Sequence, residues 1–231
     1  MAKRIAVITA RGGSKRIPRK NIRLFCDHPI IHYPIQAAMK SGLFDEIMVS
    51  TDDLEIAKVA RDEGAKVPFL RSNETSGDQA TTLSVIREVL LEYKKLGQEF
   101  DEYCCIYPTA PLLTAETLRR ANRLLEKSVA GSVIPVARYS YPIQRALRIV
   151  DGGLRMASPQ YAFSRSQDLE PHFHDVGQFY MGKTANVFHL SSLFDGHPAA
   201  LEVPEIQSQD IDEESDWEIA ELKYKILMKT E

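Results

Sequence analysis

Short apolar runs alternate with longer segments of helical period along most of the chain. Apolar runs of strand length predict five strands, at residues 5–9, 46–50, 66–69, 103–107 and 131–136. Strands that alternate with helices are typical of βαβ units, in which the sheet is largely parallel. We therefore expect one α/β domain over residues 1–231, with helices on both faces of the sheet.

Helical periodicity fills the gaps between these strands. Residues 30–41, 54–62 and 82–96 have apolar positions at helical spacing, and a further helix begins at Thr114. Helix-terminating and capping residues support these limits: Gly42 and Gly64 suit C-terminal caps, and Asp52 or Asp53 suits an N-terminal cap. Near the C-terminus an amphipathic helix is predicted from helically spaced apolar residues, which are Trp217, Ile219, Ala220, Leu222 and Ile226.

The alternation stops after residue 136. Residues 138–175 form an excursion from the sheet, with a hairpin at 148–156 that turns at Asp151 and Gly152, and the chain returns through a strand at 177–181. We find no repeat, low-complexity tract or flexible linker, so the excursion is expected to be a subdomain or an interface.

Composition places the chain among ordinary globular proteins. It has 231 residues, of which 44% are hydrophobic and 26% charged. No run approaches the roughly 18 apolar residues of a membrane span, so we expect a cytoplasmic protein with no membrane partner. Cys26, Cys104 and Cys105 lack C-x-x-C spacing and are expected to be buried thiols.

A basic, glycine-containing loop directly follows the first predicted strand. Six cationic side chains fall between residues 11 and 23, and the main chain at Gly12, Gly13 and Ser14 could turn its N–H groups toward an anion. A basic run can also be a solvated face or a nucleic-acid patch. The loop's place at the carboxyl end of a strand, where α/β proteins bind ligands, favours a triphosphate site. Neither G-x-x-x-x-G-K-[ST] nor G-x-G-x-x-G is present.

A second charged feature lies near the C-terminus. Residues 210–221 contain seven acids and no base, whereas the net charge of the chain is only −3. In extended conformation Asp210 and Asp212 lie on one face, so both carboxylates could hold a divalent cation such as Mg²⁺. The D-x-D pattern alone is weakly specific and is often a plain surface pair. Combined with a cationic phosphate loop, it predicts the second half of one site.

Four segments together resemble the acylneuraminate-type cytidylyltransferases, over essentially the whole chain. They are ARGGSKRIPRKN at 10–21, LRSNETSGD at 70–78, YPTAPLL at 107–113 and QDID at 209–212. Members of this family attach CMP, taken from CTP, to acidic nine-carbon sugars. The resemblance implies the three-layer, Rossmann-like fold of the nucleotide-diphospho-sugar transferases and a homodimer. It also implies that the excursion forms the dimer interface and lends residues to the neighbouring active site.

The resemblance also implies roles for individual residues. Lys20, Asp210 and Asp212 would be catalytic, and the two aspartates would bind Mg²⁺, with Mn²⁺ as a possible substitute. The nucleotide-binding set would be Arg11, Gly12, Gly13, Ser14, Lys15, Lys20, Asn21, Arg71 and Asp78. The sugar-binding set would be Tyr107, Arg165, Gln178 and Tyr180.

This sequence differs from the sialate enzymes at positions where the resemblance implies that the sugar is recognised. Those enzymes have a glutamine where this chain has Tyr107, and they differ at YPIQR (141–145) and HDVGQFY (174–180). These segments resemble the branch that activates pseudaminic acid, a 9-deoxy, diacetamido relative of sialic acid. An aromatic ring in place of an amide suits a less hydroxylated sugar.

Several alternatives stay open at this point. Within the enzyme class, the substrate could be sialate, legionaminate or an eight-carbon keto-deoxy sugar acid. From other classes, the chain could be a nucleic-acid-binding module or a CTP sensor; its overall acidity and single basic segment argue against the former. His172, His174 and Asp175 could suggest a metal site, but polar recognition or an ordinary surface is the more common use of such a pattern. Tyr139 and Tyr141 could stack on a base or simply pack.

Overall fold

The fold is built on a mostly parallel sheet with β1 (Arg4–Thr9) near one side of it. In the computed structural model, which describes residues 2–229, β1 lies parallel to β4 (Glu46–Ser50) and to β5 (Glu102–Ile106). The strand order is β11-β6-β10-β5-β1-β4. β6 (Ser132–Arg138) pairs in parallel with β11 (Ala199–Glu202), while β10 (Phe179–Lys183) runs antiparallel between β5 and β6. The predicted α/β class is confirmed, and the returning strand is the antiparallel one.

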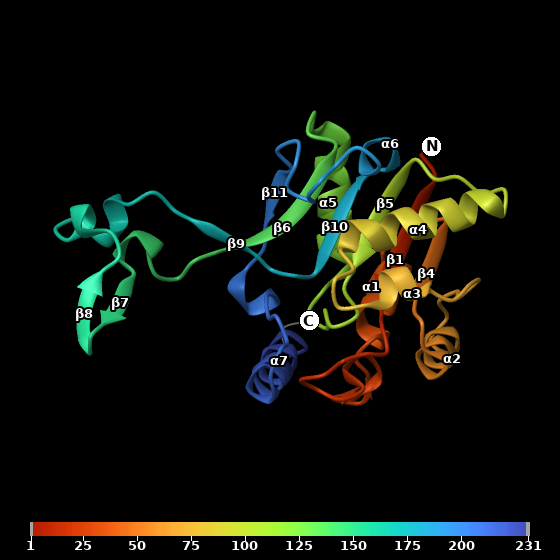
Figure 1. The fold of residues 1–231 in the computed structure, drawn as a ribbon, viewed down its shortest axis with the longest axis horizontal. Coiled ribbons are helices and arrows are strands. Elements are labelled where there is room, and N and C mark those ends of the chain that lie inside the picture. The colour runs from red at the N-terminus through yellow and green to blue at the C-terminus, as the bar shows by residue number, and fades with distance from the viewer. Residues whose placement is uncertain (1, 230–231) are drawn as a thin grey trace.

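Helices cover both faces of this sheet (Figure 1). Ala6 and Ile8 of β1 pack in one core with α1 (His32–Ser41), α2 (Leu54–Asp62) and α5 (Ala115–Lys127). Ile5 and Val7 face the other core, which contains α4 (Thr82–Lys95) and α6 (Thr184–Val187). This alternation along one strand is the period-2 pattern of a sheet buried on both sides.

The predicted caps are present at α1 and α2, and α5 has a cap that the sequence analysis did not assign. Gly42 follows α1 with φ +67°, a left-handed conformation in which glycine carries no Cβ penalty. The Asp53 carboxylate accepts the N–H groups of Glu55 and Ile56 at the start of α2. Thr114 caps α5 in the same way through the N–H of Thr117.

The predicted strand at 66–69 is wrong. Lys66 exchanges two main-chain hydrogen bonds with β4, to Ile47 and Val49, and forms an isolated bridge opposite Met48. Pro68 follows two residues later and has no N–H to continue a ladder, so the pairing stops there.

The cysteine prediction is confirmed at β5. Cys104 lies in the core of α1, α2 and α5, and Cys105 lies in the core of α4, so the adjacent thiols point to opposite faces. Both are fully buried and free. Burial raises the pKa of both thiols, that of Cys105 to about 12, which keeps them protonated and unreactive.

The excursion is an arm that projects from the body (Figure 1). Its base is the antiparallel pair of β6 with β9 (Phe173–Asp175), and its tip carries the hairpin of β7 (Leu147–Val150) and β8 (Gly153–Met156). Asp151 and Gly152 both have positive φ, as a two-residue hairpin turn of this type requires. Large apolar side chains are exposed along the arm: Tyr141, Leu147, Ile149, Leu154 and Phe163.

The predicted C-terminal helix is α7 (Glu214–Leu227). Trp217 and Ala220 are buried against Phe25 and Ile17 from the segment between β1 and α1, but Ile219 and Leu222 are exposed. Ile226, also predicted for the apolar face, is exposed as well. Only part of the periodic set is therefore a packing face in the single chain.

Short elements complete the chain. They are β2 (Leu24–Phe25), β3 (His28–Pro29), α3 (Asn73–Ser76), and the 3₁₀ turns Lys20–Ile22, Ile143–Arg145, Pro159–Tyr161, Ser166–Asp168 and Glu205–Gln207. Within residues 2–229, none of the helices combines the length and apolar character needed to cross a membrane.

Candidate active site

The basic loop opens onto a pocket of about 560 Å³ at the carboxyl end of β1. The loop supplies Arg11, Ser14, Lys15, Lys20 and Asn21 to its wall. Arg71, Asp78 and Tyr107 reach the same pocket from later in the chain. Most of the predicted nucleotide-binding residues, and one predicted for the sugar, are thus brought together around one cavity.

Acidic residues after β4 anchor the loop from outside the pocket. The N–H of Gly12 donates to Asp52 Oδ1 at 2.8 Å. Arg19, which has the left-handed φ of +55°, pairs with Asp53 at 2.5 Å and with Glu55. This ion pair holds the pKa of Asp53 below its usual value. A Cβ on Gly12 would lie 2.9 Å from an Asp53 oxygen, so this close approach requires glycine.

This anchoring differs from the predicted main-chain cradle. Gly12 donates to Asp52, and the Ser14 N–H donates to Gly12 O, so neither group is directed at a ligand. Gly12 and Gly13 do not line the pocket. The difference arises because Asp52, which accepts the Gly12 N–H, lies 40 residues away in sequence. Local residue spacing does not predict such a contact.

Two buried polar residues fix the pocket's shape. Asn21 is almost fully buried and donates its amide to Arg11 O at 2.8 Å. Arg71, also buried, donates to Ser50 Oγ and Ser50 O at 3.0 and 2.6 Å. Both side chains therefore hold neighbouring main chain in place at the pocket wall.

Asp78 is the counterion of the loop's cations. Its two oxygens lie 2.7 Å from Arg11 Nη1 and 2.5 Å from Lys15 Nζ. The hydrogen bonds from Lys15 and Arg11 hold the pKa of Asp78 below its usual value. Arg11 and Lys15 therefore direct their charges at one carboxylate of the pocket wall.

The predicted acid pair lies beside the loop's other cations. Ile211, between the two aspartates, is fully buried with Ile17, and its carbonyl accepts from Lys20 Nζ at 2.5 Å. Because alternate residues of an extended segment point to opposite sides, the burial of Ile211 turns Asp210 and Asp212 outward together. Asp212 pairs with Arg16 at 2.7 Å and lies 3.8 Å from Lys20 Nζ.

Charge and burial shift the pKa values of this group. Partial burial, and then the negative charge of Asp212, raise the pKa of Asp210. Burial lowers the pKa of Lys20, although Asp212 and Asp210 oppose that shift. The two outward carboxylates are a donor set that fits Mg²⁺, which takes one or two protein carboxylates and fills its remaining positions with water and phosphate oxygens.

The predicted sugar residues are only partly assembled. Tyr107 lines the pocket, where its hydroxyl lies 3.0 Å from Thr82 Oγ1, and its ring meets that of Tyr180 edge to face with centroids 5.5 Å apart. Gln178 is buried and donates to Gln207 O. Arg165 lies on the arm and pairs with Asp168 at 2.7 Å, outside the pocket lining.

Sequence reasoning missed the partners of Asp175 and of Arg19 around this site. Asp175 accepts from the Tyr180 hydroxyl and from the Gly177 N–H, which places a carboxylate beside the two tyrosine rings. The Arg19 ion pairs with Asp53 and Glu55 were also missed, although the unusual density of basic residues in the loop signalled that some would need partners. His172 and His174 contact main-chain oxygens of Glu170 and Asp175, and they do not form a metal cluster with Asp175 among the residues described.

Tyr139 and Tyr141 remain on the arm. The Tyr139 ring packs against His174 with centroids 5.0 Å apart, which favours packing. Tyr141 is strongly exposed.

The mostly parallel sheet, with a cationic loop and a facing acid pair at the carboxyl ends of its strands, defines the class of the protein as an α/β nucleotidyltransferase. The fold matches that of a solved CMP-2-keto-3-deoxy-manno-octonic acid synthetase complexed with CTP, with a TM-score of 0.70 and 16% identity; the match covers 99% of this chain and 100% of that one.

Sequence comparison narrows the class to a family. The profile described as Cytidylyltransferase matches residues 5–149. The pseudaminic acid cytidylyltransferase of Campylobacter jejuni subsp. jejuni serotype O:2 is 38% identical over 225 residues, which is 97% of each chain. The CMP-N,N'-diacetyllegionaminic acid synthase of Legionella pneumophila is 33% identical over 94% of each chain. The chain belongs to the cytidylyltransferase family.

Proposed function

We propose that the protein transfers CMP from CTP to the anomeric hydroxyl of pseudaminic acid and releases pyrophosphate. The observation that carries this proposal is the contact between the cationic wall of the pocket and the acid pair: Arg16 and Lys20, which both line the pocket, lie 2.7 and 3.8 Å from Asp212. The 38% identity to pseudaminic acid cytidylyltransferases over nearly the whole chain supports the choice of sugar.

The nucleotide's triphosphate would bind to the loop. Arg11 and Lys15 would exchange Asp78 for phosphate oxygens, and Arg fork geometry suits such a ligand. Lys20 would lie at the phosphates and stabilise the charge that builds up on the departing pyrophosphate. No covalent enzyme intermediate is required, because the sugar hydroxyl attacks the α-phosphorus directly.

Asp210 and Asp212 would hold Mg²⁺, or Mn²⁺ in its place, and the ion would neutralise phosphate charge. One of the two carboxylates would also take the proton from the anomeric hydroxyl. Asp210 suits this role because its raised pKa makes it a stronger base than an ordinary aspartate.

The sugar would lie against Tyr107 and Tyr180. Their edge-to-face rings present apolar surface, with hydroxyls that contact Thr82 and Asp175. Gln178 would act by fixing main chain, since its amide is committed to Gln207 O. The sugar's carboxylate would be met by Arg165.

We further propose that Arg165 reaches the pocket of a second subunit in a homodimer. The arm projects from its own body, and its exposed apolar side chains are the kind of surface that a subunit interface buries. In a two-fold dimer each arm would serve the other subunit's site.

The test is an assay with CTP, Mg²⁺ and a panel of pseudaminic, legionaminic and sialic acids, in which pyrophosphate and the CMP-sugar are both measured. We expect the highest kcat/KM with pseudaminic acid. Activity on sialic or legionaminic acid without activity on pseudaminic acid would overturn the substrate. Tight CTP binding with no pyrophosphate from any sugar would indicate a sensor.

A further inference from the structure

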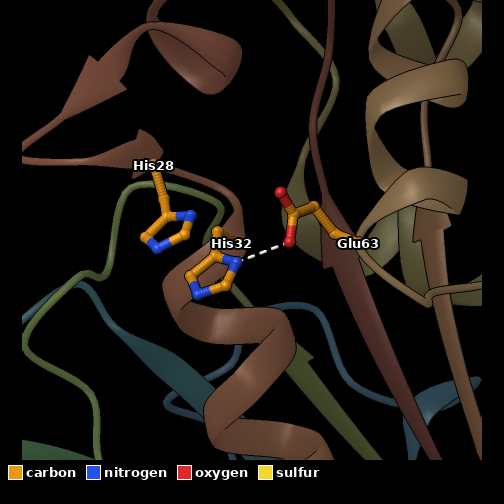
Figure 2. A group of neighbouring side chains, drawn as sticks. All are labelled: His28, His32 and Glu63. Carbon is orange, nitrogen blue, oxygen red and sulfur yellow. Dashed lines mark hydrogen bonds and ion pairs between the residues drawn. The ribbon is translucent and has the colours of Figure 1, made fainter.

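Two histidines and a glutamate meet on the surface away from the pocket lining. They are His28 in β3, His32 at the start of α1, and Glu63 just after α2 (Figure 2). One potential ligand atom from each lies within 4.8 Å of the other two. In the part of the chain that the structure describes, this is the only group of three such side chains in that range.

The three side chains bring their ligand atoms close together, although the two rings are stacked. His32 Nδ1 lies 2.5 Å from Glu63 Oε2, and the rings of His28 and His32 stack with centroids 4.0 Å apart and planes 8° from parallel. Ligand atoms of a tetrahedral zinc ion lie about 3.3 Å from one another, given Zn–N and Zn–O distances near 2.0 to 2.2 Å. Because an imidazole binds a metal in the plane of its ring, the His28 ring, which is open to solvent, would have to rotate out of the stack with His32 to bind the same ion.

The surrounding structure holds the three ligands in register. The buried ring of Tyr33 meets both imidazoles edge to face, with centroid distances of 6.3 Å to His28 and 5.4 Å to His32. Gln36, one turn along α1, donates to Glu63 O at 3.4 Å. The side chains of His32 and Glu63 are only about one-fifth exposed, at 21% and 19%, while His28 is open to solvent.

We propose that His28, His32 and Glu63 bind a divalent transition-metal ion of the zinc type, with water in the remaining position. Two imidazoles and one carboxylate are a ligand set that zinc accepts, and imidazole favours zinc over Mg²⁺. The ion replaces the direct contact between His32 and Glu63 and binds both rings in their neutral form.

The site would join three elements that border the basic loop. β3 follows the loop in sequence and α1 follows β3, while the N-terminal cap of α2 is Asp53, the partner of Arg19. Zinc would therefore stabilise the scaffold of the loop. It stands apart from the Asp210–Asp212 pair and does not depend on the transfer reaction.

The experiment measures zinc binding to untagged, metal-stripped protein by calorimetry and elemental analysis, and follows Co²⁺ by its visible spectrum. We expect one equivalent of zinc, a tetrahedral Co²⁺ spectrum, and a rise in Tm of about 5 °C at a zinc concentration 100 times Kd. Mg²⁺ at the same concentration is expected not to reproduce the rise.

Matched variants locate the ion. His28→Ala and Glu63→Gln should each weaken zinc binding about tenfold or more, since even residues that only support ligands cost this much. Two control variants should still bind one equivalent of zinc. They are His189→Ala, which removes another exposed histidine, and the double variant Asp210→Asn/Asp212→Asn. Because Glu63→Gln preserves size, it tests the site even if His28→Ala disturbs folding.

Three results would overturn the proposal. One is zinc binding that is unchanged in both His28→Ala and Glu63→Gln. Another is the absence of a zinc equivalent in the unmodified protein, which would leave His32 and Glu63 as a surface ion pair. Loss of zinc only in the Asp210→Asn/Asp212→Asn variant would assign the metal to that pair and would also contradict the proposal.

Discussion

The basic loop and the arm both offer arginines to an anion, but they are held in opposite ways. The loop's cations pair with acids far away in sequence: Arg19 with Asp53, Arg11 with Asp78 and Arg16 with Asp212. Arg165 on the arm pairs with Asp168, three residues away. The loop is therefore fixed by the tertiary fold, whereas the arm's arginine is held only by its own segment.

This difference indicates which half of the proposed active site a single chain can assemble. The proposed nucleotide half is assembled within one chain, because long-range contacts bring its cations and its acid pair together. Arg165, which we propose for the sugar half, lies outside the pocket of its own chain, and the arm that carries it exposes Leu147, Ile149 and Leu154. The predictions that follow test this division, from the largest expected effect to the smallest.

Removing the charge of Asp212 should damage the nucleotide half most. We expect Asp212→Asn to lower turnover by about 10²- to 10³-fold, as loss of a group that stabilises transition-state charge does, while the Tm changes little. Steady-state kinetics and thermal unfolding measure the two quantities. Glu218→Gln, an exposed acid on α7, is the control and should be near normal. Near-normal turnover in Asp212→Asn would rule out the proposed role.

Loss of the arm's arginine should affect the sugar and leave the nucleotide bound. Arg165→Ala is expected to lower kcat/KM for the sugar by about 10- to 100-fold, the value of a charge-assisted pair, with the Kd for CTP unchanged. Arg155→Ala, a second exposed arginine of the arm, is the control.

Hybrid dimers sharpen this comparison. Coexpression of Asp212→Asn and Arg165→Ala chains should restore about a quarter of wild-type activity, because half of the dimers are hybrids and each hybrid contains one intact site. Activity no higher than that of the separate variants would contradict an arm that serves the partner's pocket.

The loop's cations should control CTP affinity. Lys15→Ala is expected to raise the Kd for CTP about tenfold, the value of one charge-assisted contact to phosphate. Calorimetry measures the change, with Lys58→Ala on α2 as a matched control. An unchanged Kd would remove Lys15 from the triphosphate site.

Substitution of Asp78 should lower the Kd for CTP if the only role of this carboxylate is to neutralise the loop's cations. Asp78→Asn would free Arg11 and Lys15 and remove a negative charge beside the triphosphate, so we expect CTP to bind about threefold more tightly. Weaker binding would show instead that Asp78 contacts the nucleotide complex itself.

Acidification should release the divalent ion early. A carboxylate binds a cation in its deprotonated form, and the raised pKa of Asp210 means that it takes up a proton at a higher pH than an ordinary aspartate does. Mn²⁺ affinity, followed by electron paramagnetic resonance, should therefore begin to fall at a higher pH than for a simple carboxylate pair. The fall should be shallower in Asp210→Asn. Affinity that is constant down to about pH 4 would contradict the raised pKa.

Local sequence predicted the parts of the fold that local chemistry determines. Gly42 and Asp53 cap their helices as expected, and Asp151 with Gly152 turns the hairpin. The prediction of a strand at 66–69 was wrong because Pro68 has no N–H to donate to the neighbouring strand.

Sequence patterns did not predict most contacts between segments that are far apart in the chain. The Gly12 N–H was expected to face an anion, but Asp52, 40 residues later, accepts it. The meeting of His28 and His32 with Glu63 likewise depends on how α1 packs beside α2. That Asp212 lies beside the loop was predicted, because an acid pair and a cationic loop complement each other in charge, and the resemblance to a family supported that prediction.

The central claim is transfer of the CMP unit, and isotope tracing tests it most directly. The protein is incubated with pseudaminic acid, Mg²⁺ and CTP that carries ³²P in either the α or the γ position. The account predicts that α-label appears in the sugar nucleotide and γ-label only in pyrophosphate. Label from the γ position on the sugar, or no α-label on the sugar with folded protein and bound CTP, would contradict it.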